Sequence, residues 1–308
     1  MGRFQTRISQ HTVKRVRSCS AVRHNRYTRC YFSGFKARMY LLWLRVAEVL
    51  YGLASVSALA AVFGQRQRWQ RVCVPVTVLA WFFHAISCTE MLVMAHRWMP
   101  VGMHEVQSML ALLIATAFLL IAWRYRTLSF GIFALPLAFL LTVVPALGPD
   151  KFTFSSPIHS GWLFVHITAL LVAYAALIFS LSASLLYLIQ ERRLKRKRSP
   201  GFLDWLPPLE TMDQIAQTTL VLGFCGMTIG LFAGSLIAQE SYGAAYFADP
   251  KIWLSFLMWG LYVVMLFVRR STGLRGVRAV YLSSLVFLGM LSVWAANVFS
   301  SVHRFSAP

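Results

Sequence analysis

The sequence contains few charged residues and very few acidic ones. Only 13% of its 308 residues are charged, and 10 Asp and Glu residues stand against 30 Lys and Arg residues. At the same time, 58% of the residues are hydrophobic and the mean hydropathy is positive. A water-soluble domain of this size does not need such a composition, so the sequence predicts an integral membrane protein.

The five cysteines form no C-x-x-C pair. Cys19 and Cys30 precede the first apolar segment, whereas Cys73, Cys88 and Cys225 lie within apolar segments. This spacing supports neither a cysteine-based zinc site nor a thioredoxin-like thiol relay. We interpret the three cysteines of the apolar segments as packing residues.

The sequence also lacks an internal repeat and the alternating pattern of a membrane β-barrel. Barrel strands alternate apolar and polar residues over about ten positions, whereas the apolar stretches here are continuous. Inverted repeats and broken helices are typical of transporters, so their absence counts against a small-molecule transporter. Helices satisfy their own backbone groups in lipid, and the expected fold class is therefore all-α.

Eight segments meet or approach the roughly 20 residues that a helix needs to cross a bilayer. They are residues 40–63, 73–94, 106–123, 128–147, 162–189, 216–238, 252–268 and 279–300. The basic, proline-containing stretch 190–215 separates five spans from three, and Pro136 and Pro145 predict kinks in the fourth segment. The sequence predicts a polytopic membrane helical bundle with about eight transmembrane helices.

Lysine and arginine are distributed unevenly among the loops. Beyond residue 38, fifteen lie in or beside four alternate loops, and four lie in the other loops and at the C-terminus. The positive-inside rule predicts that the loops 95–105, 148–161 and 239–251 face outward. A net charge of +20 would suggest nucleic acid for a soluble protein, but this distribution indicates contacts with membrane lipid and no nucleic acid partner.

Residues 1–38 conflict with that orientation, because they contain ten Lys and Arg residues and no acid yet precede a span that should begin outside. We expect translation to begin at Met39, which leaves 1–38 as an untranslated basic arm and 39–308 as the membrane domain. The alternatives are a basic targeting segment and a basic arm kept inside, with one span misassigned.

Two histidines lie at the predicted outer ends of apolar segments, His166 at the fifth and His303 at the eighth. Haem iron accepts imidazole on one or both faces, so two such side chains could hold one haem between helix ends. For each histidine alone, the alternative is an interfacial imidazole at headgroup depth. A third, His84, lies inside the second segment, where an ionisable residue suggests function but a neutral imidazole bonded to another helix is an equal alternative.

The loop between the sixth and seventh segments is aromatic, although aromatic residues at a membrane surface are also ordinary belt residues. Residues 238–251 resemble the tryptophan-rich WWD signature of the cytochrome c assembly family, which includes CcsA and HemX-like proteins. The matching residues are Ala238, Glu240, Gly243, Asp249, Pro250 and Lys251. Tyr242, Tyr246 and Ala248 stand where the family has tryptophan.

Three further stretches are similar to the same family. In residues 162–176 a histidine, His166, precedes a tyrosine-alanine pair, and residues 295–303 resemble a final span that closes with a histidine. Residues 97–105 resemble, more loosely, a segment written R-W-x-x-x-x-x-P-x-x-N-x-Y-E. The likeness covers about residues 40–308, and by that alignment His84 corresponds to an intramembrane histidine of some members.

The resemblance implies a non-covalent b-type haem with His166 and His303 as axial ligands. Tyr242, Gly243, Tyr246 and Phe247 would form the porphyrin platform, and Glu240, Asp249 and Lys251 would hold the loop or the propionates. The implied role is haem presentation at the outer face of a bacterial inner membrane for attachment to apocytochrome c. Ligation would need a CcsB-like partner subunit. The missing tryptophans favour the alternative, a HemX-like protein that regulates or accompanies haem biosynthesis without ligation.

Overall fold

The computed structural model describes residues 39–61, 67–96, 98–100, 102–148, 161–196, 206–242, 249–273 and 277–295. Within these ranges the regular secondary structure is helical. The helices are Met39–Ala61, α2 (Gln67–Met94), α3 (Met103–Tyr125), α4 (Gly131–Leu147), α5 (Gly161–Lys195), α6 (Leu209–Tyr242), α7 (Pro250–Thr272) and α8 (Val277–Ala295). The predicted all-α bundle of about eight helices is confirmed for this part of the chain.

Six of these helices are long and apolar enough to cross a membrane, and α4 and α8 provide two shorter apolar helices. The outer surface is correspondingly apolar, with Phe82, Phe232 and Phe267 more than half exposed. Such a surface suits hydrocarbon better than water. Cys73 and Cys88 are buried as expected, but Cys225 is exposed, so the packing interpretation was wrong for Cys225.

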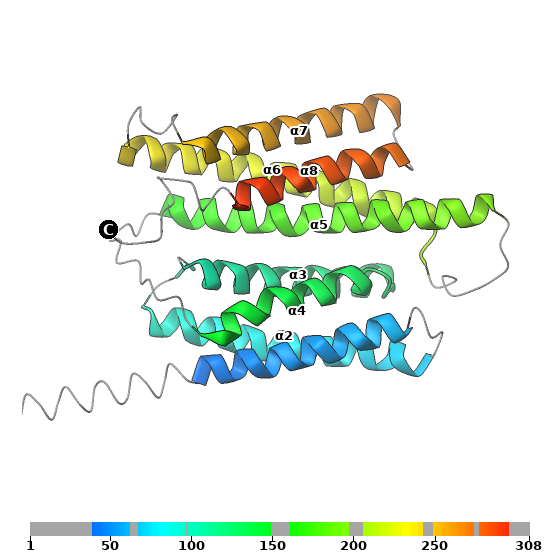
Figure 1. Ribbon diagram of the computed structural model, residues 1–308, viewed down its shortest axis with the longest axis horizontal. Coiled ribbons are helices and arrows are strands. Elements are labelled where there is room, and N and C mark those ends of the chain that lie inside the picture. Colours follow the sequence, from blue (N-terminus) through cyan, green and yellow to red (C-terminus); the bar gives the residue numbers. More distant parts are fainter. Residues whose placement is uncertain are drawn as a thin grey trace, which may run out of the picture.

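The helices form two groups around α5. The Met39–Ala61 helix, α2, α3 and α4 lie on one side, and α6, α7 and α8 lie on the other (Figure 1), with α5 in contact with α3, α6 and α8. Successive helices run in opposite directions, so α5 and α7 begin, and α6 and α8 end, toward the same end of the bundle (Figure 1). We name this the site end.

Basic residues lie mainly at the opposite end, which we name the basic end. Among the described residues these are Arg68, Arg71, Arg124, Arg126, Arg192, Arg193, Lys195, Arg196, Arg269, Arg270 and Arg278. The connector between α5 and α6 is shorter than the predicted 190–215. Both helices continue past their apolar parts, and Lys195 supports the end of α5 through a 2.7 Å ion pair with Glu191 one turn earlier.

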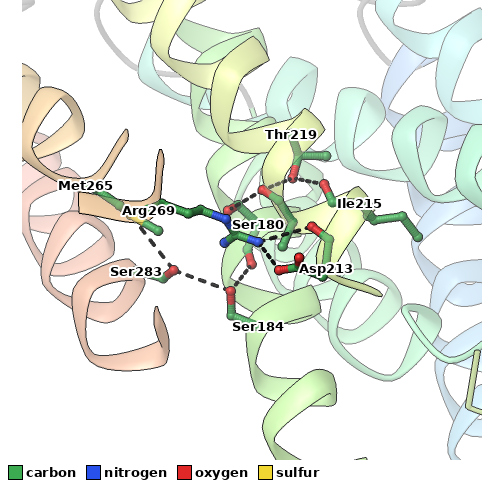
Figure 2. Close-up of polar contacts among 9 residues, drawn as sticks. Ser180, Ser184, Asp213, Ile215, Thr219, Met265, Arg269 and Ser283 are labelled. Atoms are coloured by element: carbon green, nitrogen blue, oxygen red, sulfur yellow. Dashed lines mark hydrogen bonds and ion pairs between the residues drawn. The ribbon is translucent and has the colours of Figure 1, made fainter. Parts of the chain in front are cut away.

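A cluster of polar contacts near the basic end connects the four helices α5, α6, α7 and α8. Figure 2 shows Arg269 of α7 directed at Asp213 of α6, where the guanidinium bonds to the carboxylate and, at 3.1 Å, to the backbone carbonyl of the same residue. Beside this pair, Ser180 of α5 donates to the Ala216 carbonyl at 3.0 Å. The Ser184 and Ser283 hydroxyls lie 3.4 Å apart and connect α5 with α8.

The ion pair matters for stability because both partners are largely withdrawn from solvent. The side chains of Arg269 and Asp213 are 7% and 16% exposed. Removing one member of a buried pair leaves the other charge uncompensated, which is far more costly than losing a surface pair.

Replacing Asp213 with Ala should therefore destabilise the folded protein by about 3–5 kcal/mol. The measurement is the fraction of detergent-solubilised protein that survives heating, followed by gel filtration. The matched control is Arg270→Ala, because Arg270 neighbours Arg269 but is exposed, and its effect should stay within about 0.5 kcal/mol. Equal losses for the two variants would contradict the structural importance of the pair.

Candidate functional site

His166 lies in the second turn of α5, at the site end of the bundle. The charged turn of α5 begins just after Ile189. A helix needs roughly 20 residues to cross the hydrocarbon layer. Counted back from Ile189, the apolar span of α5 therefore begins near Leu170. His166 therefore lies about one turn outside a span counted in this way.

The imidazole of His166 is bonded to the backbone of α6. Its Nδ1 lies 2.7 Å from the carbonyl oxygen of Gly230. A carbonyl oxygen only accepts hydrogen bonds, so Nδ1 carries the proton and donates it. In the neutral ring, Nε2 then has the lone pair with which an imidazole binds a metal. The ring is half-buried.

This bond depends on an unusually close approach of α5 and α6. Glycines recur on α6 at positions 226, 230 and 234, a G-x-x-x-G spacing that lets two membrane helices pack backbone to backbone. A Cβ added to Gly226 would lie 2.8 Å from the Ala169 carbonyl oxygen. Any side chain there would force the helices apart. This stripe was not predicted, although its spacing is visible in the sequence.

The charge of Lys251, in the first turn of α7, acts on the His166 imidazole. The Lys251 side chain is half-buried. A cation at this end of the bundle suits a ligand that carries carboxylates, because charge-assisted bonds are among the strongest polar contacts.

Asp249 lies at the start of α7. It is 2% exposed and is the N-cap of α7, where its side chain accepts a 2.9 Å hydrogen bond from the backbone N–H of Lys251. Pro250 follows at the first helical position, where its missing N–H costs nothing. The Asp-Pro-Lys sequence therefore begins a helix and fixes the end of the preceding loop. Holding the loop is one of the two roles considered for Asp249, and contact with a propionate is the other.

The other residues of the predicted loop are only partly described. Glu240 is exposed in the last turn of α6, and Tyr242 is the final residue of that helix. The Tyr242 side chain, Gly243, Tyr246 and Phe247 lie outside the described residues, and so does His303. The structure thus brings together His166, Lys251 and Asp249 of the predicted set.

His84 lies in the other group of helices and is fully buried in α2. Its Nδ1 is 3.3 Å from the Tyr51 hydroxyl, and its Nε2 is 2.9 Å from the Ser108 hydroxyl. Both ring nitrogens are therefore bonded to neighbouring helices. This is the arrangement of the alternative interpretation, a neutral imidazole that links helices.

Two more polar contacts hold the site end together. His104, which we expected in a loop, lies in the first turn of α3, and its Nδ1 donates to the Gly148 carbonyl at the end of α4 at 3.1 Å. Glu105 accepts a 3.3 Å bond from the backbone N–H of Gly102. No group of three or more His, Cys, Asp or Glu residues in the described ranges is placed to hold a metal ion.

Comparison with known proteins identifies the family. Residues 76–303 match the family model described as cytochrome C assembly protein. The chain belongs to the cytochrome c assembly family. The matched region includes all three candidate histidines, His84, His166 and His303, and it runs from residue 76 in the first half of α2 through α8.

Individual relatives of this assembly-family protein are named cytochrome c biogenesis protein CcsA. One from Prochlorococcus marinus (strain MIT 9215) is 31% identical over 198 residues, which are 56% of this chain and 64% of the relative. One from Chlamydomonas reinhardtii is 28% identical over 221 residues, or 70% of this chain and 53% of the relative. A Guillardia theta relative is 25% identical over 68% of this chain and 77% of its own length. The chain thus spans between half and two-thirds of the first two relatives.

The capping role of Asp249 can be separated from a role for its charge. Asn is as good an N-cap as Asp, whereas Ala accepts no hydrogen bond. Asp249→Ala should lower the stability of the detergent-solubilised protein by about 1 kcal/mol, and Asp249→Asn should stay close to the wild type. Glu240→Ala, which removes an exposed acid at the other end of the same loop, is the control. Equal destabilisation by the Asn and Ala variants would show that the charge, not the cap, is what matters.

Proposed function

We propose that this protein holds haem at the site end of the bundle during cytochrome c biogenesis, with His166 and His303 as axial ligands. The observation that supports this most directly is the bond from Nδ1 of His166 to the Gly230 carbonyl. It selects the tautomer whose Nε2 can bind iron, and metal-binding histidines almost always donate their other N–H in this way.

Chain geometry is compatible with a second ligand from His303. The last described residue of α8 is Ala295, and α8 runs toward the site end (Figure 1). The eight residues from Ala295 to His303 span at most about 26–29 Å when extended. In this proposal these eight residues carry the His303 imidazole to the side of the iron opposite His166.

The surrounding residues have complementary tasks in this proposal. Lys251 would pair with a haem propionate, Asp249 would fix the start of α7, and Glu240 would mark the other end of the loop. Tyr242, Gly243, Tyr246 and Phe247 would form the platform under the porphyrin. The bound b-type haem would supply vinyl groups, to which the cysteine thiols of a C-x-x-C-H segment add to form thioethers. His84, whose two nitrogens are already bonded, would link helices.

The relatives support this role over the HemX-like alternative. The relatives described above are named for cytochrome c biogenesis, so we assign this protein to the same process, with apocytochrome c as the acceptor. Ligation would need a CcsB-like partner subunit. The basic end, by the positive-inside rule, would face the cytoplasm of a bacterial inner membrane, and the haem would then face outward.

Single replacements of His166 and His303 by Gly test the ligand pair. Protein extracted from membranes should show a low-spin bis-imidazole haem spectrum. Each single variant should lose it, because each would leave iron with one imidazole. The matched control is His104→Gly, another histidine at the site end whose Nδ1 donates to a backbone carbonyl. If the low-spin spectrum persists in a His166→Gly, His303→Gly double variant, neither residue is a ligand.

A further inference from the structure

The imidazole of His166 occupies the space that a side chain at position 234 would take. A Cβ added to Gly234 would lie 2.5 Å from both Nδ1 and Cε1 of His166 and 3.5 Å from Nε2. Cβ atoms essentially never approach other atoms within 3.0 Å, and both close neighbours are on a ring held by its own hydrogen bond. Even a methyl group at position 234 would therefore displace the imidazole.

A methyl group at position 234 would strike the Nδ1–Cε1 edge of the imidazole. The same edge carries the hydrogen bond to α6. Nδ1 donates to the Gly230 carbonyl at 2.7 Å, and Gly230 precedes Gly234 by about one helical turn. Moving the ring away from position 234 would lengthen or break this bond. The proton would then no longer be held on Nδ1, and Nε2 would lose its fixed direction.

We propose that Gly234 is a positioning residue for the haem ligand, acting through His166. This inference rests on the proposed function and deepens it. The absence of a side chain at 234 lets the imidazole reach the Gly230 carbonyl, and that bond sets the tautomer, angle and basicity of the nitrogen offered to iron. The role is distinct from that of a helix-packing glycine, because the contact at 234 is with the ring.

The same stripe supplies a control for packing alone. A Cβ on Gly226 would also be too close to α5, at 2.8 Å from the Ala169 carbonyl oxygen and 3.3 Å from the Ala173 Cβ, but its close neighbours do not include His166. Gly260 of α7 has open space around it. Gly226→Ala thus disturbs the helix interface and can affect the imidazole only by moving the helices, and Gly260→Ala measures the effect of a glycine-to-alanine change where there is space for it.

The experiment titrates ferric haem into the purified full-length protein and its variants, with spectra and reduction potential as readouts. Gly234→Ala should bind haem about ten- to hundredfold more weakly, the usual effect of losing a partner of a metal-binding histidine. Its spectrum should shift toward high spin, and its reduction potential should become more positive because the imidazole is less basic. Gly260→Ala should keep the low-spin spectrum and the potential of the wild type. Gly226→Ala, which moves the helices without striking the ring, should change both less than Gly234→Ala does.

The decisive comparison repeats Gly234→Ala in a His166→Gly background. If Gly234 acts through the imidazole, the substitution should change haem affinity less than about twofold there, because no ring remains to be displaced. Recovery of the double variant from membranes when Gly234→Ala alone is not recovered would support the same conclusion. An equal loss in both backgrounds, or failure to recover either protein, would mean that Gly234 serves helix packing only and would overturn the inference.

The ligand role of His166 and the positioning role of Gly234 would be refuted by different results. A wild-type spectrum for His166→Gly would remove His166 as a ligand, and the positioning role of Gly234 with it. Loss of the low-spin spectrum in His166→Gly, together with an unchanged spectrum and potential in Gly234→Ala, would leave the ligand assignment in place and refute only the role of Gly234.

Discussion

The described site depends on the close approach of α5 and α6. At Gly226, Gly230 and Gly234 the two helices meet with no side chain of α6 between them, and the His166 bond to the Gly230 carbonyl exists only because of this. Water contributes no hydrophobic drive between helices inside lipid, so van der Waals packing of this kind and the hydrogen bonds it permits hold such helices together. The glycine stripe that lets the two helices pack closely thus also lets the His166 imidazole reach its hydrogen-bond acceptor.

The two ends of the bundle are stabilised by different interactions. At the basic end, the buried Arg269–Asp213 pair and the Ser184–Ser283 contact connect α5, α6, α7 and α8. At the site end, three side chains bond to the backbone: His166 to Gly230, His104 to Gly148 and Asp249 to the start of α7. A backbone partner orients a side chain without adding a charge to the site. This suits the site end, because the haem proposed to bind there carries negatively charged propionates.

Much of the fold could be predicted from the sequence, because the length of an apolar run is a local property. The helix ends were less predictable, since polar residues such as Glu191 and Lys195 continue α5 beyond its apolar part. The position of His166 followed from the same runs, but its partner did not, because a backbone carbonyl leaves no mark in the side-chain pattern. Asp249 was noticed, yet its role as an N-cap required attention to the Asp-Pro pair as a helix start rather than to its charge.

The partner of His166 is a main-chain oxygen, and this has a consequence for how variation at the site is tolerated. A main-chain oxygen survives every substitution, so no exchange at position 230 can remove the acceptor itself. Natural or laboratory variants can disturb the bond only by obstructing the imidazole or by moving α5 and α6 apart. Tolerance at position 234 should accordingly follow the volume of the incoming residue and ignore its polarity, with serine and alanine nearly equivalent and each larger residue worse than the last.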